Sequence, residues 1–312
     1  MILKDINDRS RRKIMGADVL ALNVIGYIFV AVVALACFVP FIMVISASLT
    51  SEATFVKQGF SLFPRDFSIE AYHTIFVKPD IIGKAYLVTI MMTIIGTFIA
   101  LFMTSMTAYV LRRKDFEWRN KFSFFFYFTT LFNGGLVPYY ILMIRYLSLK
   151  NSYLALLLPA MFNVFNLLVM KSYMASIPDS LIEAAKIDGA GDFATYLRII
   201  IPLSKPALAS IGLFIALGYW NEWYNAMLFI SKPTMYPLQY FLYQQLNNIE
   251  AYKRILASQS GVVSEAVVKS MSIPTQTLKM ALTFVVTGPI IFAYPFVQKY
   301  FVQGITIGAV KG

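Results

Sequence analysis

The sequence predicts an all-α membrane protein with six transmembrane helices. Of its 312 residues, 58% are hydrophobic and only 14% are charged, whereas soluble domains carry about a quarter charged residues. Several long stretches contain no Asp, Glu, Lys, Arg or His, and a helix needs about 20 apolar residues to cross a bilayer. Because backbone groups in hydrocarbon must bond within their own segment, we expect each stretch to be helical.

Five of the predicted spans are free of Asp, Glu, Lys, Arg and His, and Glu222 alone interrupts the remaining one. The first span is longer than the apolar region of a signal peptide, so we expect it to stay in the protein as an uncleaved anchor. In order, the predicted spans are residues 19–51, 85–111, 122–144, 151–170, 206–231 and 280–298.

The basic residues predict the orientation of these spans. Residues 1–18 and 112–121 hold five Lys or Arg each, whereas the link 145–150 holds two. The positive-inside rule therefore puts both termini, 112–121 and 171–205 in the cytoplasm. The net charge of +11 is then explained mostly by the basic residues that orient the spans in the membrane. No basic soluble domain remains to bind nucleic acid. The segments expected outside are 52–84, 145–150 and 232–279.

The expected organisation is a single transmembrane domain over 19–298, with a cytoplasmic N-terminal segment, 1–18, and a cytoplasmic tail, 299–312. The composition excludes some chemistry. With one cysteine, Cys37, and one histidine, His73, a disulfide framework and a Cys/His metal site are excluded. His73 is expected to be an ordinary loop residue. No P-loop motif occurs, so the chain is not expected to be an enzyme that hydrolyses nucleotides.

The cytoplasmic segment 171–205 predicts a short helix with a small-residue face. Ser180 and Glu183 have the spacing of a capping box, which would begin this helix near Leu181. Ala184 and Ala185 favour helix and carry almost no side chain, so another surface could approach their backbone closely.

A turn and a second helix are expected to follow. Gly189 stands where the end of a helix needs a left-handed residue. Asp192 can then cap a second helix that runs through Ile201 and ends at Pro202. Two short helices of this kind have two equally good interpretations. They could dock into the groove of a partner protein, or they could be an amphipathic linker that lies on the membrane surface.

The same segment resembles the EAA motif of ABC-importer permeases. Glu183-Ala184-Ala185 is followed at the family spacing by Gly189, Ile199 and Ile201-Pro202, where the family pattern ends in Leu-Pro. Residues 187–190 and 202–207 are similar to the maltose-type branch. Further similar stretches, which together extend the resemblance over the whole chain, are 132–138, 220–223 and 304–312.

The resemblance implies a type I ABC importer permease fold in the cytoplasmic membrane of a bacterium. It implies a subunit that translocates an oligosaccharide, with acidic, uronate-containing oligosaccharides among the candidates. An extracytoplasmic binding lipoprotein would deliver this substrate. A second homologous permease would complete the pathway, and two ATPase subunits would bind ATP and Mg. No cofactor is expected in this chain.

The resemblance also assigns roles to residues. It implies that the coupling helix, which sits in a groove of the ATPase, includes Glu183, Ala184, Ala185, Asp188 and Gly189. The tail 299–312 would reach the ATPase interface, although its three glycines fit a frayed terminus equally well. The outer segment 232–279 would touch the binding protein, and a simple cap over the helices is the alternative.

The fifth span carries an unusual polar group, Glu222, which is costly inside a bilayer. Aromatic rings stack on sugars, and amides or carboxylates bond to hydroxyls, so this segment is a candidate substrate pathway. Two alternatives remain open: the rings could form an interfacial belt, and Asn221 with Glu222 could fix helix packing. The candidate residues are Trp220, Asn221, Glu222, Trp223, Tyr224 and Asn225.

Two other classes of protein would also have membrane helices. A stand-alone secondary transporter or channel would work without nucleotide and would show an inverted repeat, which the sequence does not reveal. A purely structural scaffold would leave Glu222 and segment 171–205 without a task.

Overall fold

The computed structural model describes residues 17–77, 79–258, 275–289 and 291. These residues form two compact units, one made of 17–74 with 275–284 and the other of the remaining described residues. Within the described ranges the fold is helical, and the β contacts amount to an isolated bridge between Thr50 and Phe67. The tail 299–312 and most of segment 1–18 lie outside the described residues.

The first unit contains the first predicted span as one helix, α2 (Ala17–Ser48). Its apolar side chains are exposed around the helix for most of its length, which is the pattern of a helix facing lipid. Two shorter helices follow, α3 (Glu52–Gln58) and α4 (Glu70–Phe76). His73 lies exposed in α4, so the expectation of a loop at this position is wrong.

A carboxylate of α3 holds the helix at 275–289, which is where the sixth predicted span begins. Glu52 accepts hydrogen bonds from the backbone N–H groups of Gln276 and Thr277, both at 2.9 Å. The first N–H groups of a helix have no partner inside the helix, so Glu52 supplies one from elsewhere in the chain. The rest of this predicted span lies largely outside the described residues.

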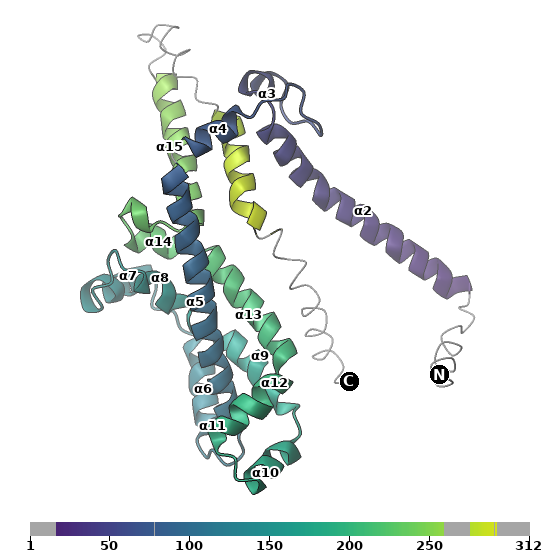
Figure 1. Ribbon diagram of the computed structural model, residues 1–312, viewed down its shortest axis with the longest axis vertical. Coiled ribbons are helices and arrows are strands. Elements are labelled where there is room, and N and C mark those ends of the chain that lie inside the picture. Colours follow the sequence, from purple (N-terminus) through teal and green to yellow (C-terminus); the bar gives the residue numbers. More distant parts are fainter. Residues whose placement is uncertain (1–16, 78, 259–274, 290, 292–312) are drawn as a thin grey trace. The chain divides into compact units, whose positions relative to one another are not determined.

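The second unit is built around α5 (Pro79–Arg112), a 34-residue helix that contains the second predicted span. It packs mainly on α13 (Lys205–Trp220) and α9 (Val164–Ala175), as Figure 1 shows. The contact face of α5 carries small residues every four positions, which allows the close approach typical of helices packed in membranes. These buried residues are Gly96, Ala100, Thr104 and Ala108.

The third predicted span is broken into α6 (Arg119–Thr129) and α7 (Leu136–Ile141). The expectation of one continuous helix over 122–144 is therefore wrong. Asn133 Oδ1 accepts a hydrogen bond from the Gly135 N–H at 2.8 Å, and Gly135 has φ of 85°. This local turn replaces helical hydrogen bonds, because asparagine side chains compete with the backbone and glycine tolerates positive φ.

The fourth predicted span is bent, and a sharper bend directly precedes the fifth. Residues Leu154–Ala160, which include α8 (Leu154–Leu157), meet α9 at 46°. A second pair, Asp192–Leu203 and Lys205–Phe229, bends by 84°. In the described part of the chain, two helices are long and apolar enough to cross a membrane, or up to four if each bent pair is one span. The multi-span character is clear, and the count of six stays a prediction.

The outer segment is not a plain connector, because it contains the 21-residue helix α15 (Leu238–Ser258). α15 packs on α5, and the backbone N–H of Leu238 donates to Thr89 Oγ1 at 2.8 Å. Leu238 is fully buried in a cluster with Ile82 and Ala85 of α5. The N-terminal part of α5 thus supports the start of α15.

Candidate functional site

The predicted coupling segment begins with α10 (Asp179–Ile187). Pro178 occupies the capping position, and no side chain caps the helix there. The predicted capping box of Ser180 and Glu183 is therefore wrong, and the helix starts two residues earlier than Leu181. Proline has no N–H to satisfy and a φ already close to helical, so a helix can begin directly after it.

The turn after α10 confirms the left-handed conformation predicted for Gly189. Its φ is 79°, and its N–H donates to the Lys186 carbonyl at 3.1 Å. The N–H of Ala190 donates to the Ala185 carbonyl at 2.8 Å. Together these two bonds form a Schellman motif, which satisfies the last carbonyls of the helix and requires a left-handed residue at this point.

The second helix differs from the prediction at both ends. Gly191, not Asp192, occupies the capping position of α11 (Asp192–Thr195), because the Asp192 carboxylate is engaged by Arg113 at 2.6 Å. The helix also does not stop at Pro202. A π-helical turn precedes this proline, and α12 (Ile201–Leu203) continues past it. Such wide turns let a helix bend instead of ending.

The two short helices present a small, mostly exposed surface. The predicted coupling residues Glu183, Ala184, Asp188 and Gly189 are exposed, whereas Ala185 is buried. The neighbouring Ile187 is 85% exposed. An apolar side chain beside small residues and two carboxylates suits a partner protein that covers this turn.

Arg112 at the end of α5 and Lys114 just after it hold the start of α10. Arg112, with a side chain only 4% exposed, donates to the Ile177 carbonyl at 2.6 Å and to Asp179 Oδ1 at 2.7 Å. Lys114 pairs with the other oxygen of Asp179 at 2.7 Å. The Lys114 ammonium lowers the pKa of Asp179, with a smaller contribution from Arg112. This carboxylate therefore stays ionised at neutral pH.

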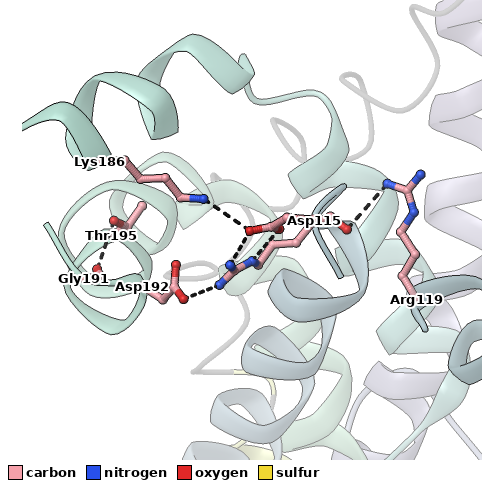
Figure 2. A network of polar contacts seen from close by, with 7 residues as sticks. Asp115, Arg119, Lys186, Gly191, Asp192 and Thr195 are labelled. Carbon is pink, nitrogen blue, oxygen red and sulfur yellow. Dashed lines mark hydrogen bonds and ion pairs between the residues drawn. The ribbon is translucent and has the colours of Figure 1, made fainter. Parts of the chain in front are cut away.

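A second group of charges ties the end of α5 to the far side of the turn (Figure 2). Arg113 contacts both Asp115 and Asp192, and Lys186 contacts Asp115 at 3.2 Å. Hydrogen bonding from Arg113, and then from Lys186, holds the pKa of Asp115 well below its usual range. From the sequence, this run of basic residues indicated only membrane orientation, and two of its partners, Asp179 and Asp192, lie far away along the chain.

The candidate substrate pathway lies at a helix break. α13 ends at Trp220, and α14 (Tyr224–Phe229) begins four residues later. Glu222 was expected inside a membrane helix, but it stands between these two helices. Its two oxygens accept from the backbone N–H and the side-chain amide of Asn225, at 2.8 and 3.0 Å. The buried carboxylate thereby supplies the first turn of α14 with an acceptor.

The hydrogen bonds of Glu222 continue to the broken third span. Tyr139 of α7 donates its hydroxyl to Asn225 Oδ1 at 2.8 Å. Asn221 is exposed, donates to the Leu217 carbonyl and accepts from Gln239 of α15. Trp220 is half-buried and packs against the cluster around Leu238. Four of the six candidate pathway residues therefore contact other protein groups: Trp220, Asn221, Glu222 and Asn225.

Two aromatic side chains of the same segment remain accessible. Trp223 is 40% and Tyr224 is 42% exposed, and Trp223 packs against Tyr243 with ring centroids 5.1 Å apart. Tyr224 also lines an open pocket of about 710 Å³ with Tyr139, Leu142 and the connection between α6 and α7. The sequence stretch 132–138, which stood out earlier, therefore lies beside the aromatic segment.

Comparison with known proteins identifies the family of this chain. Residues 117–307 match the family described as "Binding-protein-dependent transport system inner membrane component". The chain is 41% identical to the polygalacturonan/rhamnogalacturonan transport system permease protein YtcP of Bacillus subtilis, over 92% of this chain and 96% of the relative. It is 31% identical to the trehalose/maltose transport system permease protein MalG of Thermococcus litoralis, over 93% and 96% of the two chains.

A solved structure gives the same fold. The similar chain belongs to a bacterial ABC transporter involved in the import of the acidic polysaccharide alginate, with a TM-score of 0.77 and 30% identity. The match covers 92% of this chain and 98% of the other. This protein therefore belongs to the family of inner-membrane components of binding-protein-dependent transport systems and has the fold of a type I ABC permease.

Proposed function

We propose that this chain is the permease subunit of an ATP-driven importer that carries an oligosaccharide into a bacterial cell. The observation that carries the proposal is the exposed turn between α10 and α11, on a chain that shares most of its length with sugar permeases. The chain has no P-loop of its own, so partner ATPase subunits would supply ATP and Mg binding.

The coupling surface would comprise Glu183, Ala184, Asp188 and Gly189, whose side chains or backbone are accessible. Ala185 is buried, and its carbonyl closes the turn. We assign it to the shape of the surface rather than to direct contact. ATP binding in the partner can turn the pathway outward only if the ATP-bound partner interacts differently with the two permease conformations.

The sugar-contacting groups would be Trp223 and Tyr224, because both present an exposed aromatic face and Tyr224 lines an open pocket beside it. Glu222 and Asn225 would position this segment, since each oxygen of Glu222 is already bonded to Asn225. None of the residues lining this pocket carries a positive charge. An acidic substrate is therefore supported by the relatives alone, whose names include polygalacturonan and alginate transport.

The remaining assembly follows from the family. A second permease would face this chain, two ATPase subunits would bind the cytoplasmic side, and a binding lipoprotein would deliver the sugar. The positive-inside pattern supports cytoplasmic termini around a single permease domain. For segment 232–279, the packing of α15 on α5 supports a cap over the helices, while its remaining surface could receive the binding protein.

Purification of the assembled transporter tests the proposal. An affinity tag on this chain should retain a second permease and the ATPase in fixed proportion. Adding the binding protein with neutral and uronate-containing oligosaccharides should stimulate ATP hydrolysis for one class of sugar. Transport by the isolated chain without nucleotide would instead support the stand-alone transporter.

Aromatic variants test the substrate pathway in the same assay. Replacing Trp223 or Tyr224 with alanine should lower sugar transport while leaving the ATPase subunits bound. Tyr146→Ala is the matched control, because Tyr146 is 76% exposed and does not line the pocket. Equal transport by all three variants would exclude this segment from contact with sugar.

A further inference from the structure

Arg113, the residue directly after α5, contacts two carboxylates: Asp115 in the turn that follows α5, and Asp192 at the start of α11. Figure 2 labels both carboxylates. Its Nε and Nη2 atoms donate to the two oxygens of Asp115, at 2.9 and 2.5 Å. Its Nη1 atom lies 2.6 Å from Asp192 Oδ2 at the start of α11. A planar guanidinium fixes direction as well as distance in such paired contacts, which a lysine ammonium cannot do.

The same network reaches the other side of the turn. Lys186, in the last turn of α10, contacts Asp115 Oδ2 at 3.2 Å. Lys186 precedes Gly189 and Asp192 follows it, so both sides of the turn are tied to the pair Arg113–Asp115. The Schellman hydrogen bonds at Gly189 and Ala190 close the loop between them. The turn and the end of α5 thus form one closed ring of contacts.

These contacts are too exposed to contribute much to stability. The side chains of Lys186, Asp115 and Asp192 are 48%, 49% and 55% exposed, and exposed ion pairs typically contribute less than about 1 kcal/mol. The network instead fixes the position of the α10–α11 turn relative to the end of α5. The more buried Arg112, which contacts Asp179 and the Ile177 carbonyl, holds the beginning of α10 separately.

α5 can carry a displacement from this network across the unit. It is one continuous helix of 34 residues, packed on α9 and α13. Near its other end, Thr89 accepts the hydrogen bond from the N–H of Leu238, at the start of α15. A shift of the turn that moves Arg113 therefore moves a rigid element with contacts at both ends.

We propose that Arg113 is a positioning residue that transmits displacement of the α10–α11 turn to α5. This inference rests on the proposed coupling function of that turn and adds the receiving element within this chain. Arg113 itself need not touch the ATPase. Asp115 and Asp192 hold its guanidinium in place, and Lys186 completes the connection.

The test uses the full transporter in proteoliposomes and measures sugar transported per ATP hydrolysed. Arg113→Gln and Asp192→Asn should each lower this ratio about tenfold, within the usual range of coupling between sites. The double variant should be no worse than either single variant, because both remove the same interaction. Asp192→Glu, which retains the carboxylate, should recover most of the ratio. Lys121→Gln is the control, since Lys121 lies over the Trp118 ring at 4.3 Å and outside this network.

The outcomes separate this inference from the proposed function. If the native chain does not bind an ATPase, the proposed function fails. If the ATPase binds and Arg113→Gln transports with the normal ratio, only the inference fails. Additive losses in the double variant, or release of the ATPase by Arg113→Gln, would also overturn it, because the network would then shape the docking surface without carrying motion.

Discussion

The ring of Tyr219 occupies the place where a side chain on Gly96 would begin. A Cβ atom at Gly96 would lie 2.5 Å from two carbons of that ring. Tyr219 is fully buried, and its hydroxyl donates to the Leu157 carbonyl at 2.8 Å. The approach of α5 to α13 therefore depends on the absence of a side chain at one position and on a tyrosine anchored at the other.

Gly96→Ala should destabilise the protein. The added methyl group would push the ring from its place and strain its hydrogen bond, at a cost of about 1–3 kcal/mol. Gly83→Ala is the control, because it lies in the same helix with no atom near its Cβ position. Thermal unfolding in detergent should show a lower midpoint for Gly96→Ala and an unchanged or higher one for Gly83→Ala. Equal midpoints would show that the helices separate to admit the methyl group without cost.

Gly189→Val should uncouple ATP hydrolysis from transport while leaving the protein in the membrane. Gly189 has φ of 79° with open space around its Cβ position, so the cost is backbone strain, about 1–3 kcal/mol. The matched control is Gly191→Ala, because Gly191 has φ of −68° and equally open space. Normal transport by Gly189→Val, measured as sugar per ATP, would show that the left-handed turn is not part of the coupling element.

Glu222→Gln should weaken the helix break and leave the sugar response intact. The amide group of glutamine would meet the Asn225 side-chain amide, which already donates to Glu222, and one charge-assisted hydrogen bond would be lost. A cost of about 1–3 kcal/mol is typical when a buried donor loses its partner. The thermal midpoint should fall relative to Glu117→Gln, an exposed control. A shift in the sugar concentration needed for ATPase stimulation, with unchanged stability, would place Glu222 in the binding site instead.

The charge network at the end of α5 should not respond to pH in the physiological range. The Arg113 guanidinium and the Lys186 ammonium lower the pKa of Asp115, so its contribution is complete above the unfolded-state pKa of about 3.9. That contribution is lost only as pH falls through the lower folded-state pKa. Sugar transported per ATP should therefore show no step from this network between about pH 6 and 8. A step in that range that disappears in Asp115→Asn would contradict the assignment.

Apolar composition and the absence of charged residues were sufficient to predict the long helices of this fold. α2 and α5 coincide with apolar stretches of the sequence, because a bilayer requires every backbone group to be bonded within its own helix. The left-handed Gly189 was also predictable, since few other residues tolerate that conformation. Gly96, Ala100 and Thr104 offered a further signal, small residues at four-residue spacing, which indicates a close helix contact.

Hydropathy could not reveal the helix breaks. The third span breaks where Asn133 and Gly135 form a local turn, and the fifth breaks where Glu222 bonds to Asn225. A hydropathy average over a window of residues reflects apolar content. It does not show where a side chain forms hydrogen bonds with nearby backbone groups and thereby ends a helix. The partner of Asp192 was equally hidden, because Arg113 is distant in sequence and only the folded chain brings the two together.

The interruption between α13 and α14 has a consequence for the surroundings of this subunit. Peptide groups that leave a helix cannot face hydrocarbon, so they must be covered by protein or meet water. Asn221 and Trp223 keep accessible surface at this interruption among the described residues, although Asn221 bonds to Gln239 and Trp223 packs on Tyr243. In the importer proposed above, these peptide groups would therefore have to face either the second permease or water, and not the lipid.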